Sequence, residues 1–261
     1  MLFNVNDGAL LETMINNVFK PSTEWQGGLI YLGFVIVLII GSYLLGSINS
    51  AIILSKIIYH DDIRKHGSGN AGMTNMLRTY GKGAAGLTLL GDLLKTALAI
   101  ALGGFLFGFG YVGGISMTND GYCYVAGLFA VLGHIFPIYY GFKGGKGVLA
   151  TATMALRLTP VPFLILLVLF VIIVWMSKYV SLGSVTVAIL YPVVLHGYFT
   201  ITFSDAQYTM PGLIAFSTIT LAILIVWCHR GNLQRISNRT ERKISFKKKP
   251  KPEEKTNDEE E

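Results

Sequence analysis

Long apolar stretches separated by short polar connections dominate the chain. The apolar runs cover approximately residues 29–54, 83–110, 122–140, 148–158, 161–176, 182–203 and 211–228. A helix of about 20 residues, rising 1.5 Å per residue, crosses the roughly 30 Å hydrocarbon layer of a bilayer. The pattern predicts an all-α protein, a polytopic transmembrane helix bundle. Pro160 and Pro162 separate two shorter runs and predict a hairpin, which brings the expected number of helices to seven.

Composition agrees with this class of protein. Of 261 residues, 52% are hydrophobic and 14% are charged, whereas soluble domains carry about 25% charged residues. The whole chain is therefore neither an ordinary soluble enzyme, nor a disordered chain, nor a coiled coil. Two cysteines, Cys123 and Cys228, are too few for a disulfide framework.

Positive charge alternates between the connections. Segment 55–82 carries five Lys or Arg residues and the end of the chain after His229 carries ten, whereas segments 104–124 and 199–210 carry none. Basic loops stay on the cytoplasmic side of a membrane. We therefore expect the N-terminus outside and the C-terminus in the cytoplasm.

The charge distribution also divides the chain into three parts. Residues 1–28 are expected to form an N-terminal extracytoplasmic segment, with an interfacial helix near 8–20. Residues 29–242 are expected to form the membrane-embedded domain, and 243–261 a charged, disordered cytoplasmic tail. A basic segment just beyond a membrane helix favours the lipid bilayer as its partner, rather than nucleic acid.

A glycine-rich polar stretch precedes the second long apolar run. It reads Gly67-Ser-Gly-Asn70, followed by Asn75, Arg78 and Lys82. Glycine lets backbone N–H groups turn toward a ligand, and arginine grips phosphate with two parallel hydrogen bonds. The alternative is a flexible loop, but the basic residues and the position between two spans favour a phosphate site.

A second glycine-rich stretch, residues 143–147 with the sequence KGGKG, stands at a predicted helix start. A helix N-terminus offers free N–H groups and partial positive charge, and Lys146 adds a full charge. The stretch lacks the Walker A pattern. It is either an anion cradle or a basic turn that obeys the positive-inside rule.

A few ionisable residues lie within or beside the apolar runs. Asp92 and Lys95 are three residues apart, so they either pair or have a catalytic role. His134 stands near the inner end of the third run, and His229 follows the last run, three residues before Asn232. The five histidines form no metal-binding pattern, and no metal or other cofactor is expected.

Together these motifs resemble the bacterial acyl-phosphate:glycerol-3-phosphate acyltransferases, the PlsY-type family. The matching residues, in order over about 35–242, are Gly46-Ser-Ile48, Gly67–Asn70, Thr74-Asn75, Arg78, Gly81-Lys82, Asp92, Lys95, Gly133-His134, Pro137, Gly141–Val148, Tyr179–Leu182, His229-Arg230, Asn232, Arg235 and Thr240-Glu241. The order and compatible gaps make the set specific, although each piece alone is weak.

The resemblance implies a seven-helix enzyme of the bacterial inner membrane. It would transfer an acyl group from acyl phosphate to the 1-hydroxyl of sn-glycerol 3-phosphate, giving lysophosphatidic acid and phosphate. An enzyme that produces acyl phosphate is a further expected partner.

The expected roles divide the candidate residues into two sets. The catalytic set is Ser68, Arg78, Lys146, His229 and Asn232. The substrate-binding set is Gly67, Gly69, Asn70, Asn75, Lys82, His134, Gly144, Gly145, Gly147 and Ser181. Because acyl phosphate is already activated, positioning and charge stabilisation are the main requirements. A phosphate oxygen of the donor can itself serve as the base.

Two other classes of function are compatible with the basic clusters. One is a membrane transporter for an organic phosphate or another anion, although no internal repeat is evident. The other is a scaffold tethered by its basic tail.

Overall fold

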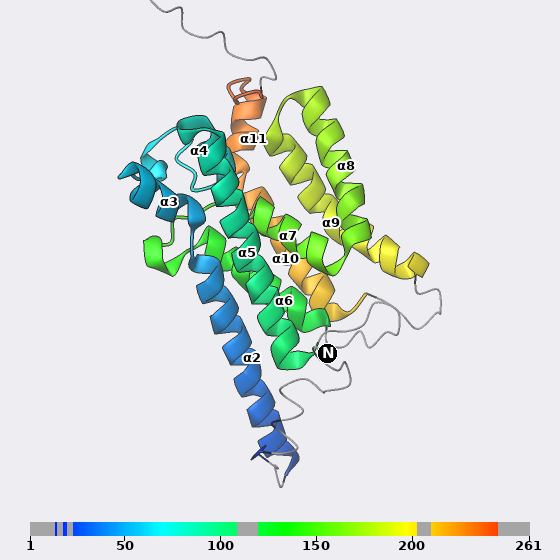
Figure 1. Ribbon diagram of the computed structural model, residues 1–261. Helices are drawn as coiled ribbons and strands as arrows, with labels where there is room; N and C mark the ends of the chain where they lie inside the picture. The colour runs from blue at the N-terminus through cyan, green and yellow to red at the C-terminus, as the bar shows by residue number, and fades with distance from the viewer. Residues whose placement is uncertain (1–13, 15–17, 20–22, 109–119, 203–209, 245–261) are drawn as a thin grey trace, which may run out of the picture.

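The regular elements are all helical in the part of the chain that the computed structural model describes, residues 14, 18–19, 23–108, 120–202 and 210–244 (Figure 1). The six longest helices are α2 (Glu24–Ser47), α5 (Lys82–Phe107), α6 (Asp120–Ile135), α8 (Pro160–Ser177), α9 (Val180–Thr202) and α10 (Gly212–Cys228). The shorter elements are α3 (Ser50–Tyr59), η2 (Ile63–Lys65), α4 (Met73–Tyr80), η3 (Ile138–Tyr140), α7 (Val148–Leu158) and α11 (Arg230–Ser237). The predicted all-α class is confirmed. Most of the predicted interfacial helix and the tail after residue 244 lie outside the described residues, whereas the N–H of Ile244 donates to the Lys178 carbonyl at 2.9 Å.

Five helical segments of the described residues are long and apolar enough to cross a membrane: Trp25–Tyr59, Lys82–Phe107, Gly121–Tyr140, Pro160–Ser177 and Val180–Thr202. Helices α10 and α11, bent by 51°, together make a sixth candidate. Helix α7 is apolar but has 11 residues, about 16 Å of helix, which is shorter than the hydrocarbon layer. The number seven requires this short helix, and it stays a prediction together with the orientation of the termini.

The first apolar run is not one continuous helix. Helix α2 ends at Ser47 and α3 begins at Ser50, and Ile48 between them has an extended backbone. Asn49 caps α3, because its side chain accepts a hydrogen bond from the backbone N–H of Ile52 at 3.0 Å. The released carbonyl of Ile48 accepts a hydrogen bond from Lys95 Nζ at 2.8 Å. A partner 47 residues away therefore stabilises the interruption.

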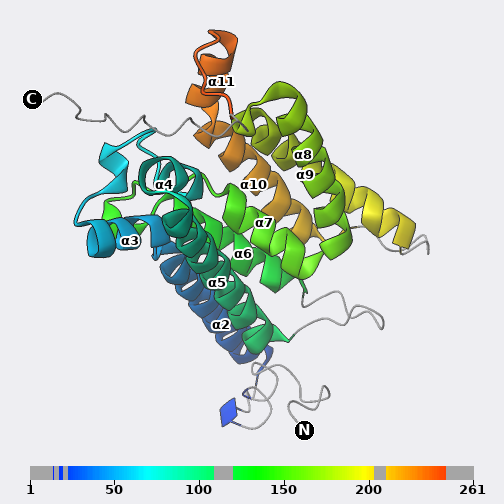
Figure 2. The same cartoon turned by 45° about the horizontal axis from the view of Figure 1, so that its top comes forward.

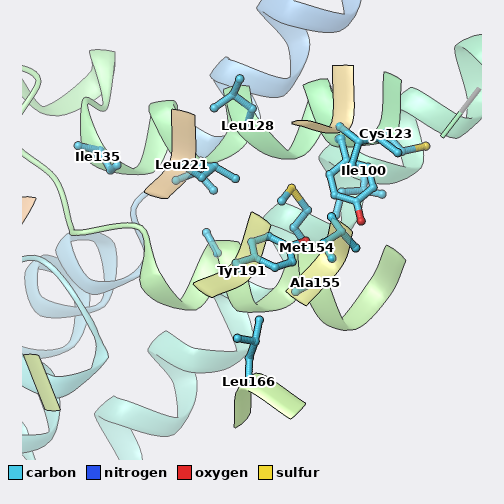
Figure 3. Close-up of a cluster of buried hydrophobic side chains, with 14 of the residues drawn as sticks. Ile100, Cys123, Leu128, Ile135, Met154, Ala155, Leu166, Tyr191 and Leu221 are labelled. Atoms are coloured by element: carbon cyan, nitrogen blue, oxygen red, sulfur yellow. The ribbon is translucent and has the colours of Figure 1, made fainter. Parts of the chain in front are cut away.

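Helix α6 is the centre of the bundle. It packs against α2, α5, α7 and α10, and Figure 3 shows Leu128 among side chains from several helices, including Met154 of α7 and Tyr191 of α9. Its contact with α2 is close: a Cβ at Gly133 would come within 2.2 Å of the Tyr43 carbonyl oxygen. Small residues allow such close packing of membrane helices.

The polar motifs gather at one end of this bundle. Figures 1 and 2 both show α4 and α11 at the same end, opposite the start of α2. Arg64 joins two connections there, because its Nη1 donates to the Tyr140 carbonyl at 2.8 Å and to the Lys143 carbonyl at 3.4 Å. Segments about 80 residues apart in sequence are thus fixed beside each other.

Candidate active site

The first glycine-rich loop, residues 67–72, is shaped by one side chain of α4. The amide of Asn75 donates to the carbonyls of Ile63 at 3.2 Å and His66 at 3.0 Å, and its Oδ1 accepts from the backbone N–H of Ser68 at 3.0 Å. Gly67 adopts a φ of +59°, in the region that favours glycine. The loop therefore presents Ser68, whose side chain is exposed.

The second glycine-rich loop, residues 143–147, is held by backbone contacts with the end of α6. The N–H groups of Gly144 and Gly145 donate to the carbonyls of Ile135 and His134 at 3.1 and 3.0 Å. A Cβ at Gly145 would lie 2.0 Å from His134 Nε2, so the position accepts only glycine. The next helix, α7, begins at Val148, as the sequence predicts for an anion cradle.

One cavity of about 430 Å³ collects ten of the fifteen predicted site residues. They are Ser68, Asn70, Asn75, Arg78, His134, Lys146, Gly147, Ser181, His229 and Asn232. Gly69 lines a more open polar recess of about 540 Å³ that shares Ser68, Asn70, Lys146 and Asn232 with the cavity. Residues from five separate parts of the sequence thus face one space.

The other four predicted residues lie outside both linings. Gly67, Gly144 and Gly145 belong to the loops and shape their backbones. Lys82 is the first residue of α5 and is exposed.

A chain of hydrogen bonds connects Lys146 to the end of the described chain. The ammonium of Lys146 donates to Asn232 Oδ1. Asn232 Nδ2 in turn donates to Ser181 Oγ at 2.9 Å and to Glu241 Oε1 at 2.7 Å, and Ser181 donates to the same carboxylate oxygen at 2.7 Å. Arg235 Nε donates to Glu241 Oε2 at 2.7 Å. The two catalytic candidates Lys146 and Asn232 are therefore fixed in orientation.

The surroundings of Lys146 and Glu241 shift the pKa of each of these two side chains. Burial lowers the pKa of Lys146, and the nearby carboxylate of Glu241 opposes this shift. Partial burial alone would raise the pKa of Glu241, but hydrogen bonds from Asn232, Ser181 and Arg235 bring it below its ordinary value. An anion that enters beside Lys146 would favour its charged form.

Glu241 is a site residue that sequence reasoning did not assign. It lines the cavity and accepts hydrogen bonds from three side chains, although in the sequence it stands out only as part of the resemblance. The available signal was a single carboxylate within a strongly basic stretch of sequence.

His229 connects α10 to α11 and is buried at the wall of the cavity. Its Nδ1 donates to the Ile225 carbonyl at 2.7 Å. In the neutral ring this leaves Nε2 as a hydrogen-bond acceptor.

The interior of the cavity is apolar. It is lined mainly by side chains of α7, α8 and α9: Leu149, Ala152, Ala155, Phe163, Leu166, Leu167, Phe170, Val187, Ala188 and Tyr191. Ser181 and Tyr191 mark the polar and apolar parts on α9, and ten residues of helix span about 15 Å. The cavity can therefore hold an anionic group at its polar end and a hydrocarbon chain inside. The described residues contain no group of three or more His, Cys, Asp or Glu side chains that could hold a metal ion.

Comparison with known proteins agrees with this architecture. A family model described as glycerol-3-phosphate acyltransferase matches residues 36–239. A glycerol-3-phosphate acyltransferase of Halalkalibacterium halodurans is 41% identical over 218 residues, which cover 81% of this chain and 96% of that protein. One of Bacillus subtilis is 39% identical over 212 residues, covering 81% and 98%.

Two solved structures are similar along most of their length. Both are crystal structures of PlsY (YgiH), an integral membrane glycerol 3-phosphate acyltransferase. The glycerol 3-phosphate form superposes with a TM-score of 0.67 at 31% identity, covering 81% of this chain and 96% of that one. The lysophosphatidic acid form gives 0.65 at 30% identity, covering 81% and 95%.

Proposed function

The chain belongs to the glycerol-3-phosphate acyltransferase family, and we propose that it transfers an acyl group from acyl phosphate to the 1-hydroxyl of sn-glycerol 3-phosphate. The ester bond to the glycerol oxygen forms while the bond between the acyl carbon and the phosphate oxygen breaks. The hydroxyl proton leaves with the phosphate, so the products are lysophosphatidic acid and hydrogen phosphate. The observation that carries this proposal is the cavity, which joins cationic and amide groups at one end to an apolar interior.

The polar end provides groups for two phosphates. Arg78, Lys146, Ser68 and Ser181 bind the phosphate of the donor, while Asn232 and His229 hold glycerol 3-phosphate or stabilise the transition state. The glycine loops, whose N–H groups at Gly69, Gly72, Gly144 and Gly145 are bonded within the protein, hold these side chains in place, with Asn70, Asn75, Lys82 and His134 in support. Charge that develops on the departing phosphate is stabilised by groups already fixed by hydrogen bonds, as Lys146 is by Asn232.

The apolar interior between α7, α8 and α9 takes the acyl chain. Its side chains exclude water from the hydrocarbon, and its length along α9 corresponds to about ten residues of helix. No residue is assigned as general base, because a phosphate oxygen of the donor can accept the hydroxyl proton. The reaction as written uses neither a metal nor another cofactor.

The protein is an all-helical, multi-pass membrane protein. Our finer proposal is a seven-helix domain over 29–242 in the bacterial inner membrane, with residues 1–28 outside and the tail 243–261 in the cytoplasm. The basic connections and the common position of α4 and α11 support this orientation. The cavity then opens toward the cytoplasm, where the enzyme that produces acyl phosphate can supply the donor; nucleic acid is not a proposed partner.

Purified full-length protein in detergent, given palmitoyl phosphate and glycerol 3-phosphate, tests the activity. We expect stoichiometric release of phosphate and lysophosphatidic acid. Arg78→Ala and Lys146→Ala should each lower kcat/KM about a hundredfold or more, because each removes a charge-assisted contact to phosphate. Lys56→Ala, at an exposed lysine of α3 outside both cavity linings, is the matched control and should retain wild-type activity.

Two outcomes would contradict the proposal. Near-normal kcat/KM in both cavity variants would remove the assigned roles. Flux of an organic phosphate across vesicles without turnover would identify a transporter instead.

A further inference from the structure

A second polar cluster lies within the bundle at the cavity wall, which its members Asp92 and His134 line. Asp92 and Lys95 lie one turn apart on α5, with only 2% and 4% of their side chains exposed. The carboxylate and the ammonium are 2.8 Å apart, so the two residues pair. Buried ion pairs are costly to desolvate and contribute little net stability, which suggests a role other than holding the fold.

Lys95 is surrounded by three acceptors. Its Nζ lies 2.8 Å from Asp92 Oδ1, 2.8 Å from the Ile48 carbonyl oxygen and 2.9 Å from Nδ1 of His134. A lysine ammonium has three N–H donors and no acceptor, so these contacts use all three. Nδ1 of His134 must therefore be the acceptor in its contact with Lys95.

The distances around His134 do not fit a ring that is protonated on Nδ1. If His134 were protonated on Nδ1, that N–H would need the carboxylate of Asp92, which lies 3.7 Å from it, too far for a hydrogen bond. Protonation would also place a second positive charge beside Lys95 in a buried site. The imidazole of His134 is thus neutral and carries its proton on Nε2.

The protonated edge of the ring lies at the second glycine loop. A Cβ at Gly145 would come 2.0 Å from Nε2, and His134 lines the cavity. The next residue of that loop is Lys146. Nε2–H is therefore a neutral donor beside the charged group that we assign to phosphate binding.

We infer that Asp92 and Lys95 are positioning residues that fix His134 as the Nε2–H tautomer, so that its ring donates a hydrogen bond to a phosphate oxygen and does not act as a base. His229 has the opposite hydrogen-bonding character, because its Nδ1 donates to the Ile225 carbonyl and leaves Nε2 as an acceptor. Both histidines of the cavity therefore leave Nε2 for a ligand, in His134 as a donor and in His229 as an acceptor. The identity of the ligand rests on the proposed function, whereas the tautomer does not.

Nitrogen NMR of histidine in the full-length protein in detergent tests the tautomer directly. Chemical shifts report which ring nitrogen carries a proton, and the variants His134→Gln and His229→Gln assign the two signals. We expect His134 protonated on Nε2 and His229 protonated on Nδ1. A proton on Nδ1 of His134 in the wild-type protein would overturn the inference, whether or not the protein shows turnover.

Removal of the Asp92–Lys95 ion pair tests whether this pair fixes the tautomer of His134. Because Lys95→Met alone leaves Asp92 buried without its partner, the double variant Asp92→Asn/Lys95→Met replaces both ions by neutral groups of similar size. His134 should then populate both tautomers. Thr88→Val is the matched control on α5, since its buried hydroxyl donates to the Ala84 carbonyl of its own helix at 2.8 Å, and it should leave the His134 signals unchanged. An unchanged tautomer in the double variant would contradict the positioning role.

Kinetics separate a donor from a base. In His134→Gln an amide nitrogen can reach the place of Nε2, whereas in His134→Asn it falls near the place of Nδ1. We expect Gln to keep kcat/KM within about tenfold of wild type and Asn to lose several-fold more, mainly through a higher KM for the phosphorylated substrates, as loss of a hydrogen bond to a charged group predicts. If kcat/KM fell by the same factor in His134→Gln and His134→Asn, and only through kcat, the donor role would be contradicted. If the wild-type protein has no turnover, the proposed function fails and the NMR result decides the tautomer by itself.

Discussion

The two glycine-rich loops supply groups to the same cavity, but they are held in different ways. Loop 67–72 depends on a side chain, because Asn75 makes three hydrogen bonds that fix its course. Loop 143–147 depends on the backbone, which bonds to the last carbonyls of α6, and on the absence of a side chain at Gly145.

This difference predicts that only the first loop is sensitive to the loss of one side chain. The first loop should fail when an existing group is removed, since the freed carbonyls and N–H would lack partners. The second should fail when atoms are added, since its closest neighbours are a buried ring and backbone oxygens. Both loops need glycine for close approach, since a Cβ would lie 2.2 Å from Asn75 Oδ1 at Gly67 and 2.0 Å from His134 Nε2 at Gly145, and Gly67 needs it also for its positive φ.

The largest expected effect comes from Gly145→Ala. The new methyl group would lie 2.0 Å from His134 Nε2 and 2.9 Å from the Ala71 carbonyl oxygen. Displacement of either disturbs both loops, so activity should fall at least a hundredfold and stability by about 1–3 kcal/mol. Acyl-transfer assays and thermal unfolding measure the two effects. Gly83→Ala, where a Cβ meets nothing within 4 Å, should change neither quantity, and a fully active Gly145→Ala protein would refute the close-contact explanation.

Asn75→Ala should have the next largest effect. It leaves the carbonyls of Ile63 and His66 and the N–H of Ser68 without this partner. The expected loss is about 1–3 kcal/mol of stability, together with a higher KM because Ser68 is no longer held in place. Asn238→Ala, at an exposed position after α11, is the control. Unchanged KM and unfolding temperature in Asn75→Ala would show that the first loop is held by its glycines alone.

Arg64→Met tests the connection between the loops. Arg64 bonds the carbonyls of Tyr140 and Lys143 and pairs with Asp62 at 2.7 Å. Because this group is partly exposed, the loss should be below about 1 kcal/mol, with KM raised a few-fold and kcat little changed. Lys65→Met, at the exposed neighbouring position, should leave KM unchanged. Equal KM values in the two variants would mean that the loops are positioned independently.

The smallest expected effect is the pH dependence of the same ion pair. Hydrogen bonds from Arg64 lower the pKa of Asp62 to about 2 from 3.8. A lowered carboxyl pKa stabilises the folded state above pH 3.8, and this contribution disappears as the pH falls toward 2. The difference in unfolding temperature between wild type and Asp62→Asn should therefore be present at pH 5 and vanish near pH 2. If the difference in unfolding temperature grew as the pH fell, the prediction would be contradicted.

The sequence by itself determined the class of fold and nominated ten of the residues that line the cavity, although not Glu241. Apolar runs in a bilayer must satisfy their backbone hydrogen bonds internally, which leaves helices as the outcome. Glycine, lysine and arginine clusters in the polar connections are local signals, and six of the residues they nominated line one cavity. The helix starting at Val148 was likewise a local prediction that is confirmed.

Only the tertiary structure decided the contacts between distant segments. The interruption of the first run at Ile48 is stabilised by Lys95, and Glu241 reaches Ser181 across 60 residues of sequence. The sequence left open whether Asp92 and Lys95 pair or catalyse, and their link to His134 depends on how α5 packs against α6. Composition and periodicity fix which residues enter the membrane, whereas the direction of a polar side chain depends on which acceptor the packed helices bring within about 3 Å.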